Sequence, residues 1–144
     1  KTNKANLKDT LTELTLINEK TLQVGLFMLT IGTFLGGVWA NESWGRYWGW
    51  DPKETWALAS VLVYVFVLHM RFIPPLKGKY VFSVASLVAI WAIIMTYFGV
   101  NYYLSGLHSY AAGDPMPIPA FVYYLVVITI LSAILAKFKY KKHY

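Results

Sequence analysis

The stretch WGRYWGWDPKET, residues 44–55, concentrates flat aromatic rings beside a small number of charges. We refer to four aromatic residues of this stretch and the tryptophan that follows it as the aromatic set: Trp44, Tyr47, Trp48, Trp50 and Trp56. Rigid aromatic surfaces suit large planar apolar ligands that carry a polar edge. The cations Arg46 and Lys53 could bind carboxylates on such an edge. Haem fits this description, whereas a quinone fits the rings but offers no carboxylate to the cations.

The aromatic residues have a second interpretation, as an interfacial belt, because Trp and Tyr prefer the headgroup level of a membrane. A belt needs only one or two aromatic residues at each helix end. Here Trp39 and the aromatic set fall within eighteen residues, and Gly45 and Gly49 alternate with them. Glycines allow a flat ligand to approach the backbone closely. If the loop is helical, Trp44 and Trp48 share one face.

Asp51 is a candidate site residue that also has a purely structural interpretation. The order Asp51-Pro52-Lys53-Glu54 predicts a helix N-cap, with Pro at the first helical position and Glu completing a capping box. The two interpretations are compatible, because capping would fix the aromatic residues in place.

Imidazole is the usual protein ligand of haem iron, so the three histidines are candidates. His69 lies inside an apolar run, where an ionisable group indicates a functional site. Its structural alternative is a neutral ring bonded to a neighbouring helix. His108 lies in the loop 101–119, on the same side as the aromatic set. His143 lies in a Lys-rich tail, and we expect it to be solvated.

His69 and His108 lie at different depths, because His69 follows Pro52 by about 25 Å of helix at 1.5 Å per residue. They therefore cannot ligate one iron, and two haem positions would be needed. A transporter or an assembly machine has that arrangement. An electron-transfer cytochrome b normally uses two His per haem inside the membrane, which this chain does not supply.

The elements that must position these residues are membrane helices. The chain of 144 residues is 57% hydrophobic and 14% charged, against about a quarter charged in soluble domains. Four runs could span a bilayer: residues 22–40, 55–73, 80–100 and 120–138. Residues 1–20 predict a short amphipathic surface helix. We therefore expect an all-α polytopic membrane helix bundle.

Lysine and arginine predict the orientation of this bundle in the membrane. Eleven of the 13 Lys and Arg residues lie on the side of both chain ends and the 71–79 loop, which we expect to be cytoplasmic. Arg46 and Lys53 lie on the other side, with the 101–119 loop. Because the +6 net charge gathers where the spans end, it does not indicate nucleic acid as a partner. The absence of Cys excludes disulfides and covalent attachment of haem to this chain.

Small residues predict close helix packing in two of the spans. Gly32 and Gly36 form a G-x-x-x-G pattern in the first span, and Ser83, Ser86 and Ala89 form a stripe in the third.

The sequence WGRYWGWDPKETWAL closely resembles the tryptophan-rich WWD signature of the cytochrome c assembly family, haem-handling membrane proteins of the CcsA/ResC, CcmC and CcmF kinds. The resemblance covers about residues 20–138. His69 in VLVYVFVLHMRF and His108 in FGVNYYLSGLHSYA are similar to the membrane and external histidines of the CcsA/ResC branch.

The resemblance implies a division into a cytoplasmic-side segment 1–20, a transmembrane haem-handling domain 21–138 and a basic cytoplasmic tail 139–144. It implies that haem b is carried as substrate, with His69 an axial ligand at an inner position. His108 would be an axial ligand of an external haem held by the aromatic set. The implied partners are membrane lipid, apocytochrome c with its Cys-x-x-Cys-His, and a ResB-like subunit or fused domain.

The implied function is haem export across a bacterial cytoplasmic membrane and its presentation for attachment to apocytochrome c. No residue stands out as a nucleophile or general base, so the thiols would come from the substrate. Because second axial histidines are missing, we expect the chain to be the C-terminal part of a larger protein, or to rely on another chain for them. The alternatives are a haem- or quinone-binding redox subunit of a respiratory complex, and a structural subunit.

Overall fold

The computed structural model describes residues 2–104 and 117–143, and within this part every regular element is helical. His108 lies outside the described residues. The four long helices are α1 (Thr2–Trp44), α2 (Pro52–His69), α3 (Lys79–Ile94) and α5 (Ala120–His143). The short turns are η1 (Met70–Phe72), η2 (Pro74–Leu76), the π-helical η3 (Met95–Gly99) and α4 (Val100–Tyr103). The all-α prediction is confirmed.

Four helical stretches are long and apolar enough to cross a membrane: Ala5–Trp44, Pro52–Phe72, Lys79–Tyr103 and Ala120–Lys139. Between 0% and 17% of the residues in their most apolar windows are buried inside the chain. Apolar side chains therefore cover the outside of the bundle, as expected of helices that face lipid or further protein. The protein is a multi-pass membrane protein.

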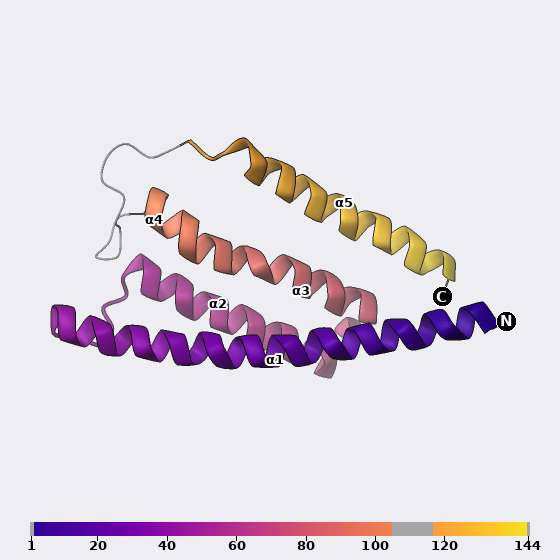
Figure 1. Cartoon of the computed structure of the whole chain (residues 1–144), viewed down its shortest axis with the longest axis horizontal. Helices are drawn as coiled ribbons and strands as arrows, with labels where there is room; N and C mark the ends of the chain where they lie inside the picture. Colours follow the sequence, from indigo (N-terminus) through magenta and orange to yellow (C-terminus); the bar gives the residue numbers. More distant parts are fainter. Residues whose placement is uncertain (1, 105–116, 144) are drawn as a thin grey trace.

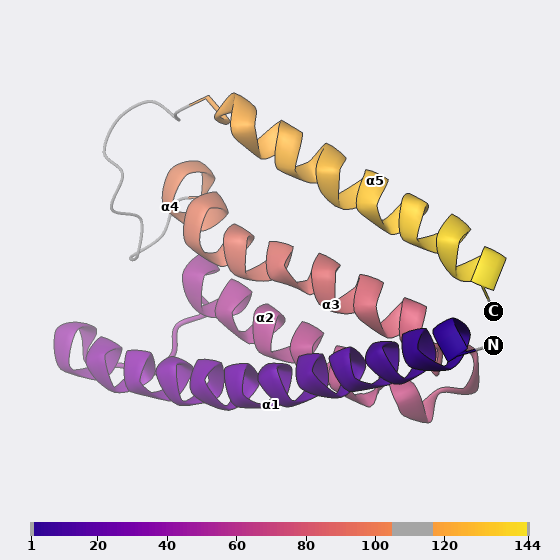
Figure 2. The same cartoon turned by 45° about the vertical axis from the view of Figure 1, so that its right-hand side comes forward.

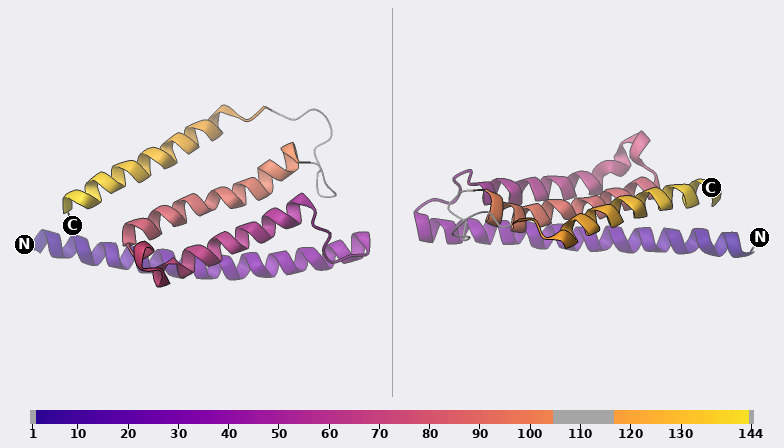
Figure 3. Two further views of the ribbon diagram at one scale, coloured as in Figure 1. Left: turned by 180° about the vertical axis from the view of Figure 1, so that it is seen from behind. Right: turned by 90° about the horizontal axis from the view of Figure 1, so that it is seen from above.

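The helix α1 runs along the whole length of the bundle, and α2 and α3 pack beside it (Figure 1). The α5 helix packs on α3, where the Tyr80 hydroxyl donates a hydrogen bond of 2.8 Å to the Ala133 carbonyl oxygen. Seen from above, α2, α3 and α5 form a shallow layer over α1 (Figure 3). The loop of residues 45–51, which we call the aromatic loop, lies at one end of the bundle with the start of α5. Both termini lie at the other end (Figure 2).

The helix expected over residues 1–20 is present, but it continues without a break into the first span and is not a separate short element. These residues form the first part of α1, which has 43 residues and is about 64 Å long, or roughly twice the thickness of a hydrocarbon core. Residues 2–24 contain no Gly or Pro that would interrupt the helix.

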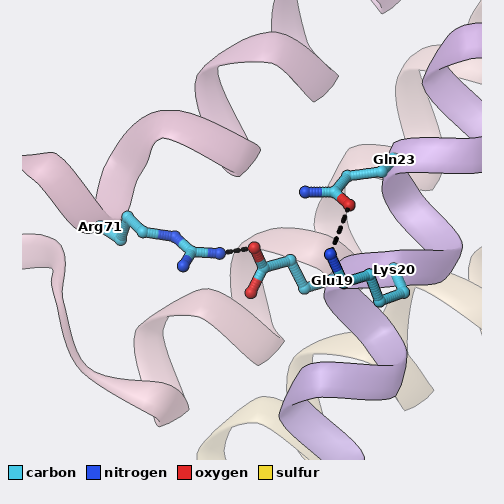
Figure 4. Close-up of polar contacts among 4 residues, drawn as sticks. All are labelled: Glu19, Lys20, Gln23 and Arg71. Carbon is cyan, nitrogen blue, oxygen red and sulfur yellow. Dashed lines mark hydrogen bonds and ion pairs between the residues drawn. The ribbon is translucent and has the colours of Figure 1, made fainter.

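Polar contacts hold this first part of α1 against α2 and α3. Asn18 donates a hydrogen bond of 3.1 Å to the Ser86 hydroxyl, and Lys79 donates one of 2.5 Å to Thr12. Arg71 forms an ion pair with Glu19, whose neighbour Lys20 bonds along α1 to Gln23 (Figure 4). The cluster of Val67, Met70, Phe82 and Ala89 forms the apolar core at this end.

Two of the three residues in the predicted small-residue stripe of α3, Ser86 and Ala89, take part in packing. Ser86 bonds to α1, and Ala89 is 3% exposed. Ser83, in contrast, faces outward and is exposed.

Candidate functional site

The loop that carries the aromatic residues leaves α1 at Gly45. Gly45 has a φ of +72°, a value that glycine adopts readily, and its amide bonds to the Asn41 carbonyl oxygen at 2.8 Å. Residues 45–51 are not helical. Trp44 and Trp48 therefore do not share a helix face, which they would have done only in a helical loop.

The predicted capping box is present at the start of α2. The Asp51 side chain accepts a hydrogen bond from the Lys53 amide at 3.2 Å, and the Glu54 side chain accepts one from the Asp51 amide at 3.2 Å. Pro52 begins the helix. Asp51 is 7% exposed, so its observed role is to cap a buried helix start.

Glu54 has a second contact that sequence reasoning missed. Its Oε2 atom also accepts a hydrogen bond of 2.7 Å from the Gly49 amide, and Glu54 is 8% exposed. The two donors flank Trp50, which has a φ of +58°, uncommon for a residue with a side chain. Glu54 therefore holds both sides of a strained position. The only sequence signal for Glu54 was the capping pattern, which predicts its contact with the Asp51 amide but not with the Gly49 amide.

A groove of about 740 Å³ lies between α1, the aromatic loop, α2 and η3. Its volume falls within the range of small-molecule sites in proteins, roughly 300–1,000 Å³. On α1 it is lined by Met28, Leu29, Gly32, Thr33, Gly36, Gly37 and Trp39. Opposite them are Tyr47, Trp48, Lys53, Glu54, Ala57 and Thr96.

Among the residues that the structure describes, Gly32 and Gly36 line this groove and no helix packs against them. A Cβ atom added at either glycine would meet no neighbouring atom of the described chain within 4 Å. Both glycines are exposed. By contrast, a Cβ at Gly37 would lie 3.2 Å from the Tyr47 carbonyl oxygen, so the loop backbone approaches α1 at that residue.

The structure divides the aromatic set. Tyr47 and Trp48 line the groove, together with Trp39. Trp44 packs edge-on against Trp39, with ring centroids 5.0 Å apart. Trp50 packs edge-on against Trp48 at 5.8 Å and is 70% exposed. Trp56 is not among the lining residues.

The two predicted cations also differ in position. Lys53 lines the groove, donates a hydrogen bond of 2.6 Å to the Asn101 side-chain oxygen, and lies 5.6 Å from the Tyr97 ring centroid. The guanidinium of the exposed Arg46 lies against Gly49, where an added Cβ would have to displace it. Lys53 is thus the groove cation, and Arg46 lies on the outer surface of the loop.

Thr96 closes the groove with a network of polar contacts. Its hydroxyl lies 2.9 Å from the Ser60 hydroxyl, 3.0 Å from the Trp56 carbonyl oxygen and 2.8 Å from the Ala92 carbonyl oxygen. Ser60 is completely buried. Thr96 belongs to η3, and such π-helical turns occur frequently at functional sites.

His69 ends α2 and does not line the groove. Its Nδ1 atom lies 2.7 Å from the Val65 carbonyl oxygen of its own helix. Because a carbonyl can only accept, Nδ1 donates this hydrogen bond, and in the neutral ring Nε2 carries the lone pair. Searched over the part of the chain that the structure describes, no cluster of three or more His, Cys, Asp or Glu residues could hold a metal ion.

Residues 1–108, which include the aromatic loop and α1 to α4, match the sequence profile of the cytochrome c assembly protein family. The chain belongs to the cytochrome c assembly protein family. Among similar proteins, NrfI of Wolinella succinogenes is 60% identical over 105 residues, which are 73% of this chain and 12% of that protein.

Two cytochrome c biogenesis proteins named CcsA are also similar to this family member. The protein of Synechococcus sp. strain CC9902 is 48% identical over 94 residues, or 65% of this chain and 31% of the relative. The protein of Cyanophora paradoxa is 47% identical over 94 residues, or 65% of this chain and 29% of the relative. The chain thus matches less than a third of the length of each of these relatives.

Proposed function

We propose that this chain handles haem during cytochrome c biogenesis, and that it presents haem on the outer face of a bacterial cytoplasmic membrane for attachment to apocytochrome c. The observation that carries the proposal is the groove at the aromatic loop. It combines Tyr47 and Trp48 with the cation Lys53 and an apolar helix face. Such a site suits a planar apolar ring with a carboxylate edge. The relatives named for cytochrome c biogenesis support the same function.

The residues divide the work of holding haem b, which is the substrate. Trp39, Tyr47 and Trp48 contact the ring, and Lys53 binds a carboxylate at its edge. His108 supplies an axial nitrogen on the outer side, and Trp44, Trp50 and Trp56 support the loop. Arg46 lies at the outer surface, where it can contact a carboxylate or the incoming apocytochrome.

His69 acts at a separate inner position, as an axial ligand through its Nε2 atom. The hydrogen bond from Nδ1 to the Val65 carbonyl oxygen supports this role, because ligating histidines commonly donate their other N–H to a carbonyl or carboxylate. His69 is exposed on the bundle surface. Its opposing ligand therefore comes from elsewhere, in our proposal from a ResB-like subunit or fused domain.

The contribution of the chain to attachment is positional. Each thiol of the Cys-x-x-Cys-His segment adds its sulfur and hydrogen across one vinyl group, so the step needs no nucleophile from this chain. Residues of the groove hold the ring edge beside the thiols, which is a proximity effect. Ligation by His108 would tune the reduction potential of the iron, because the identity of the axial ligand influences haem potential.

The test compares Trp48→Ala in the groove with Trp91→Ala in α3, which does not line it. We expect Trp48→Ala and His108→Ala to lower both the haem absorbance of the purified full-length protein and the yield of cytochrome c with covalent haem. Trp91→Ala should leave both unchanged. Normal cytochrome c maturation in the groove variants, or haem that quinol reduces reversibly with no maturation defect on deletion, would contradict the proposal.

A further inference from the structure

We infer that the Gly32–Gly36 face of α1 is the surface on which the haem ring lies, inside the membrane and below the aromatic loop. This inference rests on the proposed function and adds a binding surface to it. Gly32 and Gly36 lie one turn apart on the floor of the groove, and an added Cβ at either would meet nothing in the described chain within 4 Å.

A helix usually contains glycine where another helix packs closely or where the backbone needs a positive φ. Neither condition is seen at Gly32 or Gly36. No described helix packs on them, and among the described glycines only Gly45 has a positive φ. A glycine inside a helix costs roughly 0.5–1 kcal/mol relative to alanine. What Gly32 and Gly36 provide is open space beside the helix backbone, because neither has a side chain to fill it.

The groove places this space at membrane depth. It follows α1 from Met28 to Trp39, within the apolar stretch Ala5–Trp44. Gly32 and Gly36 are exposed, so no side chain of the described chain covers this face. A flat ring can therefore enter sideways along α1 and reach Tyr47 and Trp48 by its leading edge.

The charge at the groove selects the occupant. Lys53 lines it from α2, and its ammonium group donates to the neutral Asn101 amide. Glu54 also lines the groove, and its carboxylate accepts hydrogen bonds from the Gly49 and Asp51 amides of the loop. The groove thus presents a cation at its rim and an apolar floor, which matches a planar ring with acidic substituents. Quinones and neutral lipids lack the carboxylate.

The test is a matched pair of substitutions in α1 of the full-length protein, Gly32→Leu and Gly25→Leu. Gly25 is also exposed, an added Cβ there also meets no described atom within 4 Å, and it does not line the groove. Leucine favours a helix more than glycine, so both variants should fold. We expect Gly32→Leu to weaken binding of added haem about tenfold or more, the scale of an overfilled site, with Gly25→Leu unchanged.

A second experiment tests whether Lys53 binds a carboxylate of haem. It compares haem with haem dimethyl ester, in which the carboxylates are blocked. Lys53→Gln should weaken binding of haem but not of the ester, whereas Gly32→Leu should weaken both. Normal haem binding by Gly32→Leu, equal losses in Gly32→Leu and Gly25→Leu, or a change only in copurified lipid would each overturn the inference. These results leave the proposed function standing, which fails separately if Trp48→Ala matures cytochrome c normally.

Discussion

Glu54 links the start of α2 to the conformation of the aromatic loop. One carboxylate oxygen accepts from the Asp51 amide, which belongs to the helix cap, and from the Gly49 amide, which belongs to the loop. Trp50 lies between these two donors in a left-handed conformation. Such strain persists when the surroundings fix it, and the buried carboxylate supplies that constraint. The cap and the position of the exposed indole are therefore coupled.

We predict that Glu54→Ala destabilises the fold by about 1–3 kcal/mol, because it leaves buried amides without an acceptor. Glu54→Gln should lose less stability, since the oxygen of its side-chain amide can still accept these hydrogen bonds. The measurement is thermal unfolding in detergent followed by tryptophan fluorescence. Glu42→Ala is the control, because Glu42 is exposed near the end of α1. Equal melting temperatures for the Ala variants at 42 and 54 would show that the carboxylate does not hold the loop.

At the scale of elements, α1 joins two regions that differ in chemistry. Its first part is bound through Thr12 and Asn18 to α3 and through Glu19 to η1. Its second part carries the glycine face of the groove. One uninterrupted helix connects the two regions.

The position of the first part of α1 against α3 can be tested by cross-linking, since this chain contains no Cys. Asn18→Cys with Ser86→Cys should react with a short thiol cross-linker, because the two native side chains are 3.1 Å apart. Asn18→Cys with Val88→Cys should not react, because Val88 is 50% exposed on another side of α3. Cross-linking of the second pair but not the first would mean that the first part of α1 lies elsewhere.

For the whole molecule, the most telling property is how little of its apolar surface the chain buries by itself. No more than 17% of any span's most apolar window is buried, and the chain matches between 12% and 31% of the length of the relatives described above. Exposed apolar faces on α1 and α5 are therefore expected to contact lipid or further protein. The groove and His69 both open onto this outer surface.

The proposed orientation predicts which exposed positions a membrane-impermeant thiol reagent reaches. In intact cells, Arg46→Cys in the aromatic loop should be labelled, because the arginine- and lysine-poor side faces outward. Lys77→Cys, between η2 and α3, should be labelled only after the membrane is opened. Both native residues are exposed. The reverse pattern would place the loop in the cytoplasm and remove the site from the face where haem is presented.

The sequence by itself determined the features that depend on neighbouring residues. The apolar spans follow from local composition, and the Asp51 cap follows from four consecutive residues. The tryptophan-rich stretch also revealed the family without knowledge of the fold. These features are accessible because their physical causes lie within a few residues of chain.

Only the tertiary structure decided which residues share the groove and what the glycines do. The spacing of Gly32 and Gly36 is the same whether a helix or an open space lies against them, because glycine has no side chain that records its neighbour. Similarly, the pattern around Glu54 does not reveal the Gly49 amide, which reaches it through the path of the loop. Contacts between segments depend on how helices pack and loops return, and no single segment carries that information.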